Sequence, residues 1–297
     1  LPSFKNSVIT IGTFDGVHEG HRKIIEALKQ QATAAGGESV IITFDPHPRK
    51  IVSPNEPLQL INTLDEKIWL LSQTGIDHVV IVPFTKEFSE QSADEYIENF
   101  LISNFHPHTI IIGYDHHLGK ERKGNFGLLA EKGDQCGYRL LEIPKYILDE
   151  IGVSSTKIRN ALLASGIEKA NKLLGYEFFF EGVVVHGDKL GRELGYPTAN
   201  LTYTDADKIR LGHGVYAAYA TIGNKMVKGM LSIGTRPTLA QSEERIEINL
   251  FDWSKDIYGK TVRVTVKKFL RGQEKYDSLE AWKEQMAVDR ENSLGVL

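Results

Sequence analysis

The sequence predicts an α/β domain followed by a β domain. The first, over residues 1–175, is expected to hold a mostly parallel sheet with crossover helices, because short apolar runs alternate there with helical patterns. The second, over residues 176–297, is expected to be a small antiparallel β-barrel with a C-terminal helix, because its strand-like runs follow one another directly; this pattern is also typical of a small sandwich. A length of 297 residues accommodates two domains of ordinary size.

Five β-rich runs predict the strands of the first domain, and apolar residues at helical spacing predict the helices. Ile24, Leu28 and Ala35 recur on one helix face, and Gly36 is suited to end that helix. A second helical pattern begins at Leu64. The five runs begin at Ser7, Ser39, His78, Thr109 and Arg139.

The second domain contains strand-like runs separated by turns that carry glycine or asparagine. A helix is expected after Ser278, with Leu279, Trp282 and Met286 on one face. The runs are EGVVVHG, GVYAAYATIG, KMVKGMLSIG, RIEINLFDW and KTVRVTVKKF.

The composition argues against several classes of partner. The chain carries 35 Lys and Arg against 39 Asp and Glu, so nucleic acid, which is bound through clustered basic residues, is not expected as a partner. The longest apolar runs are far shorter than the roughly 20 residues of a membrane-spanning helix, so no membrane span is expected. The single cysteine, Cys136, cannot form an internal disulfide, which indicates a reducing cytoplasm.

A glycine-rich turn after the first strand predicts a phosphate site. Its glycines allow close approach to an anion, and the following helix presents unpaired N–H groups at its start. His18 and His21 lie three residues apart, so both imidazoles can donate hydrogen bonds to a polyphosphate. The alternative is a turn with two solvent-facing histidines. A zinc protease site is excluded, because His-Glu-Gly-His is one residue short of HExxH.

A second phosphate site is predicted in HGDKLGRELGYPTANL, although the chain has no GxxxxGK[ST] sequence. Glycines form a loop that can approach phosphate, two basic residues supply charge, and the oxygens of Thr198 and Asn200 suit magnesium. The alternative is a simple hairpin connection. The residues of this candidate site are Gly187, Lys189, Gly191, Arg192, Gly195, Pro197, Thr198 and Asn200.

These segments resemble the motifs of bacterial bifunctional riboflavin kinase/FAD synthetases. GTFDGVHEGH resembles the signature GxFDGxHxGH, and PTANL matches the magnesium- and ATP-binding segment of the kinases. TFDPHP, LINTLDEK, FSEQSADEYI and VSSTKIR agree with further family motifs, in order and over almost the whole chain. The resemblance implies a Rossmann-like nucleotidyltransferase domain that makes FAD from FMN and ATP. It implies a C-terminal domain that makes FMN from riboflavin and ATP.

For the adenylyltransferase, the resemblance implies that His18 and His21 contact the ATP phosphates. The FMN phosphate is already ionised at neutral pH, so no general base is needed. VSSTKIR is expected to close over the phosphates, with a capped helix as the alternative. Flavin or adenine contacts are expected from Asp45, His47 and Asn62. The implied ATP-binding residues are Gly12, Phe14, Asp15, Gly16, Gly20, Asp115, Ser154, Ser155, Thr156 and Arg159.

One segment departs from the family. GYDHHLGKERKGN, which contains Asp115, lacks the aromatic-rich centre of the family pattern, and a charged surface loop is the alternative there.

For the kinase, the resemblance implies Glu247 as the base for the riboflavin hydroxyl. Glu247 points opposite to its apolar neighbours on a strand, so a solvated residue is the alternative. Asn249 stands where the family usually has His, and Arg271 is the candidate on the flavin side.

The sequence thus predicts an enzyme with Mg²⁺ and ATP, with riboflavin, FMN and FAD as substrates and products. A monomer or weak homo-oligomer in the cytoplasm is expected. A nucleotidyltransferase with another acceptor, such as phosphopantetheine or nicotinate mononucleotide, is an alternative that leaves PTAN and Glu247 unexplained. A flavin carrier without turnover is the non-enzymatic alternative.

Overall fold

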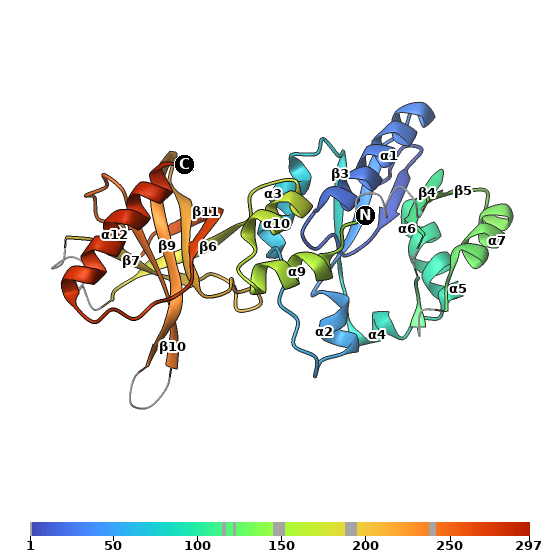
Figure 1. Cartoon of the computed structure of the whole chain (residues 1–297). Helices are drawn as coiled ribbons and strands as arrows, with labels where there is room; N and C mark the ends of the chain where they lie inside the picture. Colours follow the sequence, from blue (N-terminus) through green and yellow to red (C-terminus); the bar gives the residue numbers. More distant parts are fainter. Residues whose placement is uncertain (1, 115–116, 121–122, 145–151, 188–194, 238–241) are drawn as a thin grey trace. The chain divides into compact units, whose positions relative to one another are not determined.

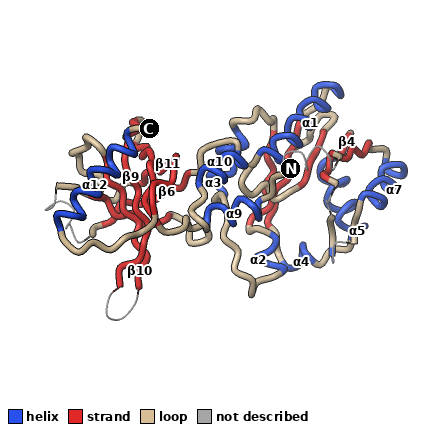
Figure 2. Tube along the Cα trace, in the orientation of Figure 1, coloured by secondary structure: helices blue, strands red, loops and turns tan. Residues whose placement is uncertain are grey.

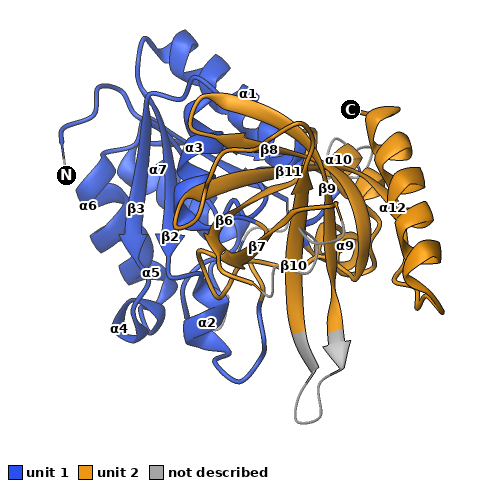
Figure 3. Cartoon of the chain, turned by 90° about the vertical axis from the view of Figure 1, so that its left-hand side faces the viewer, with its two compact units in different colours: residues 1–58, 62–155 blue, residues 59–61, 156–297 orange. Residues whose placement is uncertain are grey.

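The computed structural model describes residues 2–114, 117–120, 123–144, 152–187, 195–237 and 242–297. The chain forms two compact units, coloured separately in Figure 3. The first comprises residues 1–58 and 62–155, and the second comprises residues 59–61 and 156–297. Four predicted site residues lie outside the described residues: Asp115, Lys189, Gly191 and Arg192.

The first unit contains the predicted parallel sheet (Figure 1), and its strand order is β3-β2-β1-β4-β5. The chain runs outward from β1 to β2 and β3 on one side, and then to β4 and β5 on the other. The order therefore reverses between β1 and β4, and ligands of such sheets bind outside the carboxyl ends of the strands at this point. The strands are β1 (Val8–Ile11), β2 (Ser39–Asp45), β3 (His78–Pro83), β4 (Thr109–Gly113) and β5 (Arg139–Ile143).

The two helices that were predicted in this unit are present. Helix α1 (Glu19–Ala35) packs against β1, β2 and β4 and buries Ile25 and Leu28. Its end is set by Gly36, which adopts a left-handed backbone with a φ of 56°. Helix α3 (Leu64–Ser72) begins with a capping box. The other helices within the described residues of this unit are α2 (Pro48–Val52), α4 (Lys86–Ser89), α5 (Ala93–Glu95), the π-helix η1 (Tyr96–Ile102), α6 (Ser103–Phe105) and α7 (Phe126–Cys136).

The second unit is a closed barrel of antiparallel strands in the order β10-β7-β6-β11-β8-β9, which confirms the predicted barrel. Figure 2 shows the strands of this unit in red, with β6, β9, β10 and β11 labelled. Strand β7 was not among the expected strands, because the glycines and Pro197 before it are typical of a loop. The strands are β6 (Phe179–Val185), β7 (Thr198–Tyr203), β8 (Gly214–Ile222), β9 (Lys225–Pro237), β10 (Ser242–Leu250) and β11 (Thr261–Arg271).

In the part of the second unit that the structure describes, three helices accompany the barrel. Helices α9 (Ser155–Leu163) and α10 (Ile167–Leu174) precede the barrel, and Asn171 of α10 donates a hydrogen bond to the Val266 carbonyl of β11 at 3.0 Å. Helix α12 (Leu279–Leu294) packs against β8, β9 and β11 (Figure 1).

The predicted apolar face of α12 is wrong in one respect. Leu279 is 44% exposed, whereas Asp289 and Ser293 are fully buried. The buried carboxylate has a partner on β11, so this helix packs partly through an ion pair rather than through apolar residues alone. None of the described helices is long and apolar enough to cross a membrane.

Candidate active sites

The loop after β1 folds sharply at the carboxyl edge of the sheet. Phe14 and Val17 have left-handed backbones with φ of 49° and 36°, and Gly16 between them has a φ of 92°. Such conformations cost energy for residues other than glycine and cluster at functional sites. The Gly12 amide donates to the Ile42 carbonyl at 3.0 Å, which ties the loop to β2. The backbone of the loop after β1 is therefore held in one unusual conformation.

His18 and His21 lie together at the start of α1. His18 caps the helix, because its Nδ1 accepts a hydrogen bond from the His21 amide at 3.3 Å. The two imidazoles stack with their centroids 3.7 Å apart and their planes 10° apart. His18 is only 7% exposed, so the alternative of two solvent-facing histidines is wrong for it. The Phe14 ring lies 5.0 Å from the His21 ring and supports the pair.

His21 is held in the neutral form. Burial lowers its pKa well below the ordinary value, and the charges of His18 and Lys67 lower that pKa further. Its Nδ1 is buried and has no hydrogen-bond partner among the described residues. A neutral imidazole still carries one N–H, so His21 can donate a hydrogen bond to a phosphate oxygen.

The segment before α9 contacts the loop after β1. Ser155 Oγ donates to the Asp15 carbonyl at 2.9 Å. A Cβ atom on Gly20 would lie 3.0 Å from Val153 Cγ1 and 3.3 Å from His18 Cε1, so glycine is needed for this close approach. The structure thus brings together predicted residues from the two ends of the first unit, and Ser154 lies next to them in the same segment.

Thr156 and Arg159 belong to the second unit. Thr156 lies exposed in the first turn of α9. The Arg159 Nε donates to the Gln59 carbonyl at 2.9 Å. The two interpretations of VSSTKIR, a capped helix start and a phosphate-binding segment, do not exclude each other.

The predicted flavin or adenine residues lie on separate segments of the first unit. Asn62 is buried, and its backbone N–H donates to the Asp15 carboxylate at 3.2 Å. Asp45 is exposed at the end of β2. His47 caps α2 by accepting a hydrogen bond from the Arg49 amide at 3.2 Å. Asn62 is therefore tied directly to the loop after β1, whereas Asp45 and His47 follow the neighbouring strand.

The sequence analysis did not single out Lys67 as a site residue. Its side chain is only 8% exposed, and its Nζ donates to oxygens of Thr13, Thr43 and Phe44. A signal was available, because Lys67 follows Leu64 by three residues and precedes Leu71 by four. That spacing places a lysine on the apolar face of a helix, where an unpaired charge is costly.

The second site is built across β7 and β10. The Thr198 hydroxyl donates to Glu247 Oε2 at 3.2 Å, and Asn200 lies directly opposite Glu247 in the strand register. Ile246 and Ile248 are buried, as the strand alternation predicts, and Glu247 is half-buried on the other face. The three predicted residues Thr198, Asn200 and Glu247 are thus brought together.

Two further contacts hold the start of β7. Asn249 is 5% exposed, and its Nδ2 donates to the Pro197 carbonyl at 2.7 Å. A Cβ atom on Gly187 would lie 2.0 Å from Asn200 Nδ2, so the backbone at Gly187 lies directly against that amide. Gly195 has a φ of 87°, a left-handed conformation that favours glycine.

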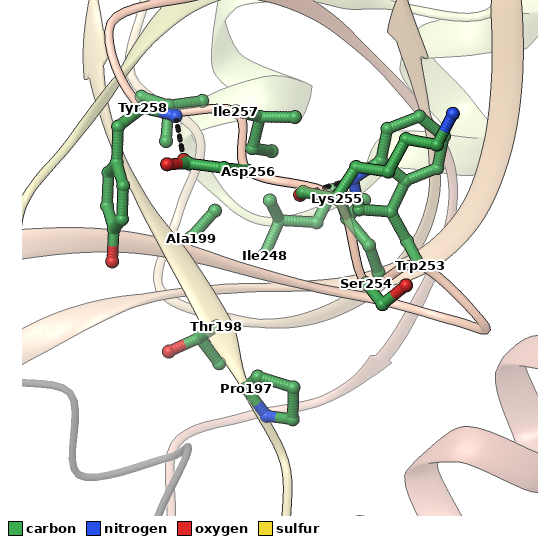
Figure 4. A pocket seen from close by; sticks show the side chains of 12 residues that line it. Pro197, Thr198, Ala199, Ile248, Trp253, Ser254, Lys255, Asp256, Ile257 and Tyr258 are labelled. Carbon is green, nitrogen blue, oxygen red and sulfur yellow. Dashed lines mark hydrogen bonds between the residues drawn. The ribbon is translucent and has the colours of Figure 1, made fainter.

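A pocket of about 370 Å³ opens beside these residues (Figure 4). Its size suits a small organic ligand. The loop after β10 forms one wall, where the Trp253 indole donates to the Lys255 carbonyl and the Asp256 carboxylate accepts from the Tyr258 amide, both at 2.9 Å. The sequence analysis assigned no site role to this loop. The pocket residues are Val184, Pro197, Thr198, Ala199, Ile248, Leu250, Trp253, Ser254, Lys255, Asp256, Ile257 and Tyr258.

Arg271 forms a bidentate ion pair with Asp289 of α12. Its Nε donates to Oδ1 at 3.0 Å and its Nη2 donates to Oδ2 at 2.7 Å. Gln285 donates to the same carboxylate at 2.9 Å. The pair fixes the orientation of the guanidinium at the end of β11.

Thr198 and Asn200 offer hard oxygen donors that fit a magnesium ion shared with substrate phosphates, because Mg²⁺ takes few protein oxygens. Among the described residues no cluster of three or more His, Cys, Asp or Glu residues could hold a metal by itself. A metal at this site would therefore depend on the bound nucleotide for part of its coordination.

Comparison with known proteins covers both units. A family model described as FAD synthetase matches residues 2–157, and one described as riboflavin kinase matches residues 174–297. A bifunctional riboflavin kinase/FMN adenylyltransferase of Escherichia coli strain K12 is 33% identical over 95% of this chain and 90% of its own. The protein of the same name from Bacillus subtilis strain 168 is 33% identical over 97% of this chain and 92% of its own.

A solved structure shows the same fold. It is titled as a macrolide-efflux protein from Streptococcus pneumoniae and is 30% identical to this chain. The TM-score is 0.88, and the match covers 99% of this chain and 94% of that chain.

Proposed function

This chain belongs to the family of bifunctional riboflavin kinase/FMN adenylyltransferases, and we propose that its two reactions occur at the two phosphate sites described above. It phosphorylates riboflavin with ATP to give FMN, and it adenylylates FMN with ATP to give FAD and pyrophosphate. Adenylyl transfer is assigned to the site of His18 and His21 in the first unit. Riboflavin phosphorylation is assigned to the site of Thr198 and Glu247 in the second unit.

The stacked histidines carry the adenylyltransferase assignment. The FMN phosphate attacks the α-phosphorus of ATP, and the bond to pyrophosphate breaks. Because the nucleophile is already ionised, the protein has to orient the reactants and stabilise negative charge. Neutral His21 donates a hydrogen bond to a phosphate oxygen, and His18 does the same from the start of α1, where the helix dipole also favours anions.

Several neighbouring residues complete this site in the proposal. The loop after β1 approaches the ATP phosphates through Gly12 and Gly16, while Phe14 and Gly20 shape the space around the histidines. Ser154, Ser155, Thr156 and Arg159 bind the phosphates as well. Asp45, His47 and Asn62 place the flavin or the adenine, and the hydrogen bond between Asn62 and Asp15 supports this role.

The contact between Thr198 and Glu247 carries the kinase assignment. Glu247 accepts the proton of the riboflavin 5′-hydroxyl as that oxygen attacks the γ-phosphorus of ATP, the bond from this phosphorus to the bridging oxygen breaks, and ADP leaves. Thr198 and Asn200 would hold Mg²⁺, which neutralises charge on the phosphates when it is bound. The adenosine part of ATP occupies the pocket beside Pro197 and Tyr258, and its apolar lining supports this placement.

The flavin side of the kinase site is assigned to the end of β11. Arg271 is held there by Asp289 and by the Gly272 carbonyl, to which its Nη1 donates at 3.0 Å, so the remaining N–H of Nη1 and of Nη2 can face a flavin carbonyl or a phosphate. Asn249 replaces the usual His and keeps the Pro197 carbonyl in place. We expect this exchange to leave the base, Glu247, functional.

We place both reactions in a reducing cytoplasm, which the single cysteine supports. The nearly balanced charge supports small molecules, rather than nucleic acid or a membrane surface, as the partners. We expect a monomer or a weak homo-oligomer.

Product analysis by liquid chromatography tests the proposal. Purified protein is incubated with ATP and Mg²⁺ and with either riboflavin or FMN. Riboflavin is expected to give FMN and then FAD, and FMN is expected to give FAD. Chelation of Mg²⁺ is expected to stop phosphorylation. Folded protein that forms neither product would refute the assignment and leave a flavin carrier as the alternative.

A further inference from the structure

Lys67 contacts the loop that follows β1 and leads to His18 and His21. It occupies the first turns of α3, and its Nζ lies 3.3 Å from the Thr13 carbonyl, 3.1 Å from Thr43 Oγ1 and 3.3 Å from the Phe44 carbonyl. An ammonium has three N–H donors, whereas a neutral amine has two. Three oxygen acceptors around one nitrogen therefore match the charged form.

The charge of Lys67 is not cancelled by a neighbouring ion pair. The three oxygens that accept hydrogen bonds from its Nζ are two backbone carbonyls and a hydroxyl, all of them neutral. Burial lowers the pKa of Lys67, and the more distant charges of Asp15 and Asp45 raise it. A buried cation with neutral partners is costly to the folded protein. The same charge creates a positive potential at the site, and a bound anionic ligand would offset the free-energy cost of burying it.

Lys67 also connects two segments of the site. Thr13 belongs to the loop after β1, and Thr43 and Phe44 belong to β2. Thr43 Oγ1 itself donates to the Thr13 carbonyl at 3.2 Å, so the lysine and the threonine fix one carbonyl together. The next residue, Phe14, has the left-handed backbone and places its ring against His21.

We propose that Lys67 is a positioning residue for adenylyl transfer, which fixes the loop after β1 and supplies a buried positive charge toward the ATP polyphosphate. The inference rests on the assignment of this site to FMN adenylylation. Lys67 acts through Thr13 and Phe14 and through its field, and it does not need to touch the substrate. The charge is the larger part of the effect, because electrostatic interactions are stronger away from water.

Three variants separate charge from hydrogen bonding. Lys67→Gln keeps N–H donors but removes the charge, whereas Thr43→Val keeps the charge but removes one acceptor. Lys67→Arg keeps the charge with altered geometry. Lys67→Gln is expected to lower kcat for FAD formation by about 10-fold or more, and Thr43→Val by less than about 3-fold. Lys67→Arg is expected to fall between them. Riboflavin phosphorylation by the same preparations serves as the internal control.

The titration of His21, followed by NMR without substrates, gives a readout besides activity. The charges acting on His21 are those of His18 and Lys67. Lys67→Gln is expected to raise the pKa of His21, whereas Thr43→Val is expected to leave it nearly unchanged. An unchanged His21 pKa in Lys67→Gln, or equal losses of FAD formation in Lys67→Gln and Thr43→Val, would overturn the proposal.

A measurement on the unaltered protein covers the case in which Lys67→Gln fails to fold. The Lys67 side chain is expected to stay charged at neutral pH, as its ¹³Cε chemical shift reports. A neutral amine there would overturn the proposal. Failure of the unaltered protein to form FAD would instead refute the proposed function, while the charge of Lys67 and its effect on His21 would still be measurable.

Discussion

The Thr198 hydroxyl donates a hydrogen bond to Glu247 across the antiparallel strands β7 and β10. The bond joins the segment proposed to bind magnesium and ATP to the residue proposed as the base. Because β10 also pairs with β9, Glu247 lies on a strand that is held on both sides. The base and the phosphate-binding segment therefore have a fixed relationship within the barrel before any substrate binds.

Thr198→Val is expected to lower kcat for riboflavin phosphorylation by about 100-fold, because it removes the donor to Glu247 and one magnesium oxygen while keeping the side-chain volume. Steady-state assays of FMN formation over a range of Mg²⁺ concentrations measure the effect. Thr198→Ser keeps the hydroxyl and is the matched control. Equal activity of the valine and serine variants would contradict the role given to the hydroxyl.

Gly187→Ala is expected to lower riboflavin phosphorylation by about 10-fold, because its Cβ atom would displace the Asn200 amide. FAD formation from FMN is expected to stay unchanged. Gly272→Ala is the control, since a Cβ atom there meets nothing within 4 Å. If both alanine variants phosphorylate riboflavin equally well, the close approach of Gly187 to Asn200 has no functional role.

Asp289→Asn is expected to destabilise the barrel by about 3 kcal/mol, because it leaves the partly buried Arg271 without its counter-charge. Chemical denaturation followed by the fluorescence of the barrel tryptophans measures the loss. Asp252→Asn removes an ion pair with Arg290 of the same helix, in which Asp252 is 86% exposed. That control is expected to cost less than about 1 kcal/mol, and similar losses in the two variants would contradict the prediction.

Acid is expected to destabilise the protein through His21. The folded-state pKa of His21 lies well below its ordinary value, so the unfolded chain takes up a proton first as the pH falls. The contribution of His21 to the free energy of unfolding is therefore fully present above about pH 6.5. Below that pH it decreases by at most about 1.4 kcal/mol per pH unit.

His21→Gln removes the titrating group. The free energy of unfolding of the wild type, minus that of His21→Gln, is expected to decrease from about pH 7.5 to about pH 5.5. Denaturant titrations of both proteins at several pH values measure this difference. A difference that is constant, or that grows as the pH falls, would show that His21 is not held neutral by its surroundings.

The periodicity of the sequence was sufficient to predict most of the fold. The runs at Ser7 and Thr109 became central strands because their apolar residues are buried on both faces of the sheet. Strand β7 could not be predicted in this way. Strand β7 pairs with β10, which is distant in sequence and contains Glu247. The local sequence PTANL gives no sign of this pairing.

The sites were predictable where a motif is contiguous and less so where contacts are long-range. The pair His18 and His21 lies within one motif, so its sequence spacing already implied proximity. Lys67 contributes to that site only because α3 returns to the end of β2, which depends on tertiary packing. The partner of Arg271 is likewise distant in sequence, because Asp289 lies on α12 and meets Arg271 only through the packing of that helix on β11.

The most direct test of two separate sites is to assay both reactions in His21→Ala and in Glu247→Gln, with folding checked by circular dichroism. His21→Ala is expected to abolish FAD formation from FMN and to retain riboflavin phosphorylation. Glu247→Gln is expected to do the reverse, since it removes the base from the barrel site alone. Loss of both activities in either folded variant, or of neither, would contradict the assignment of the two reactions to two sites.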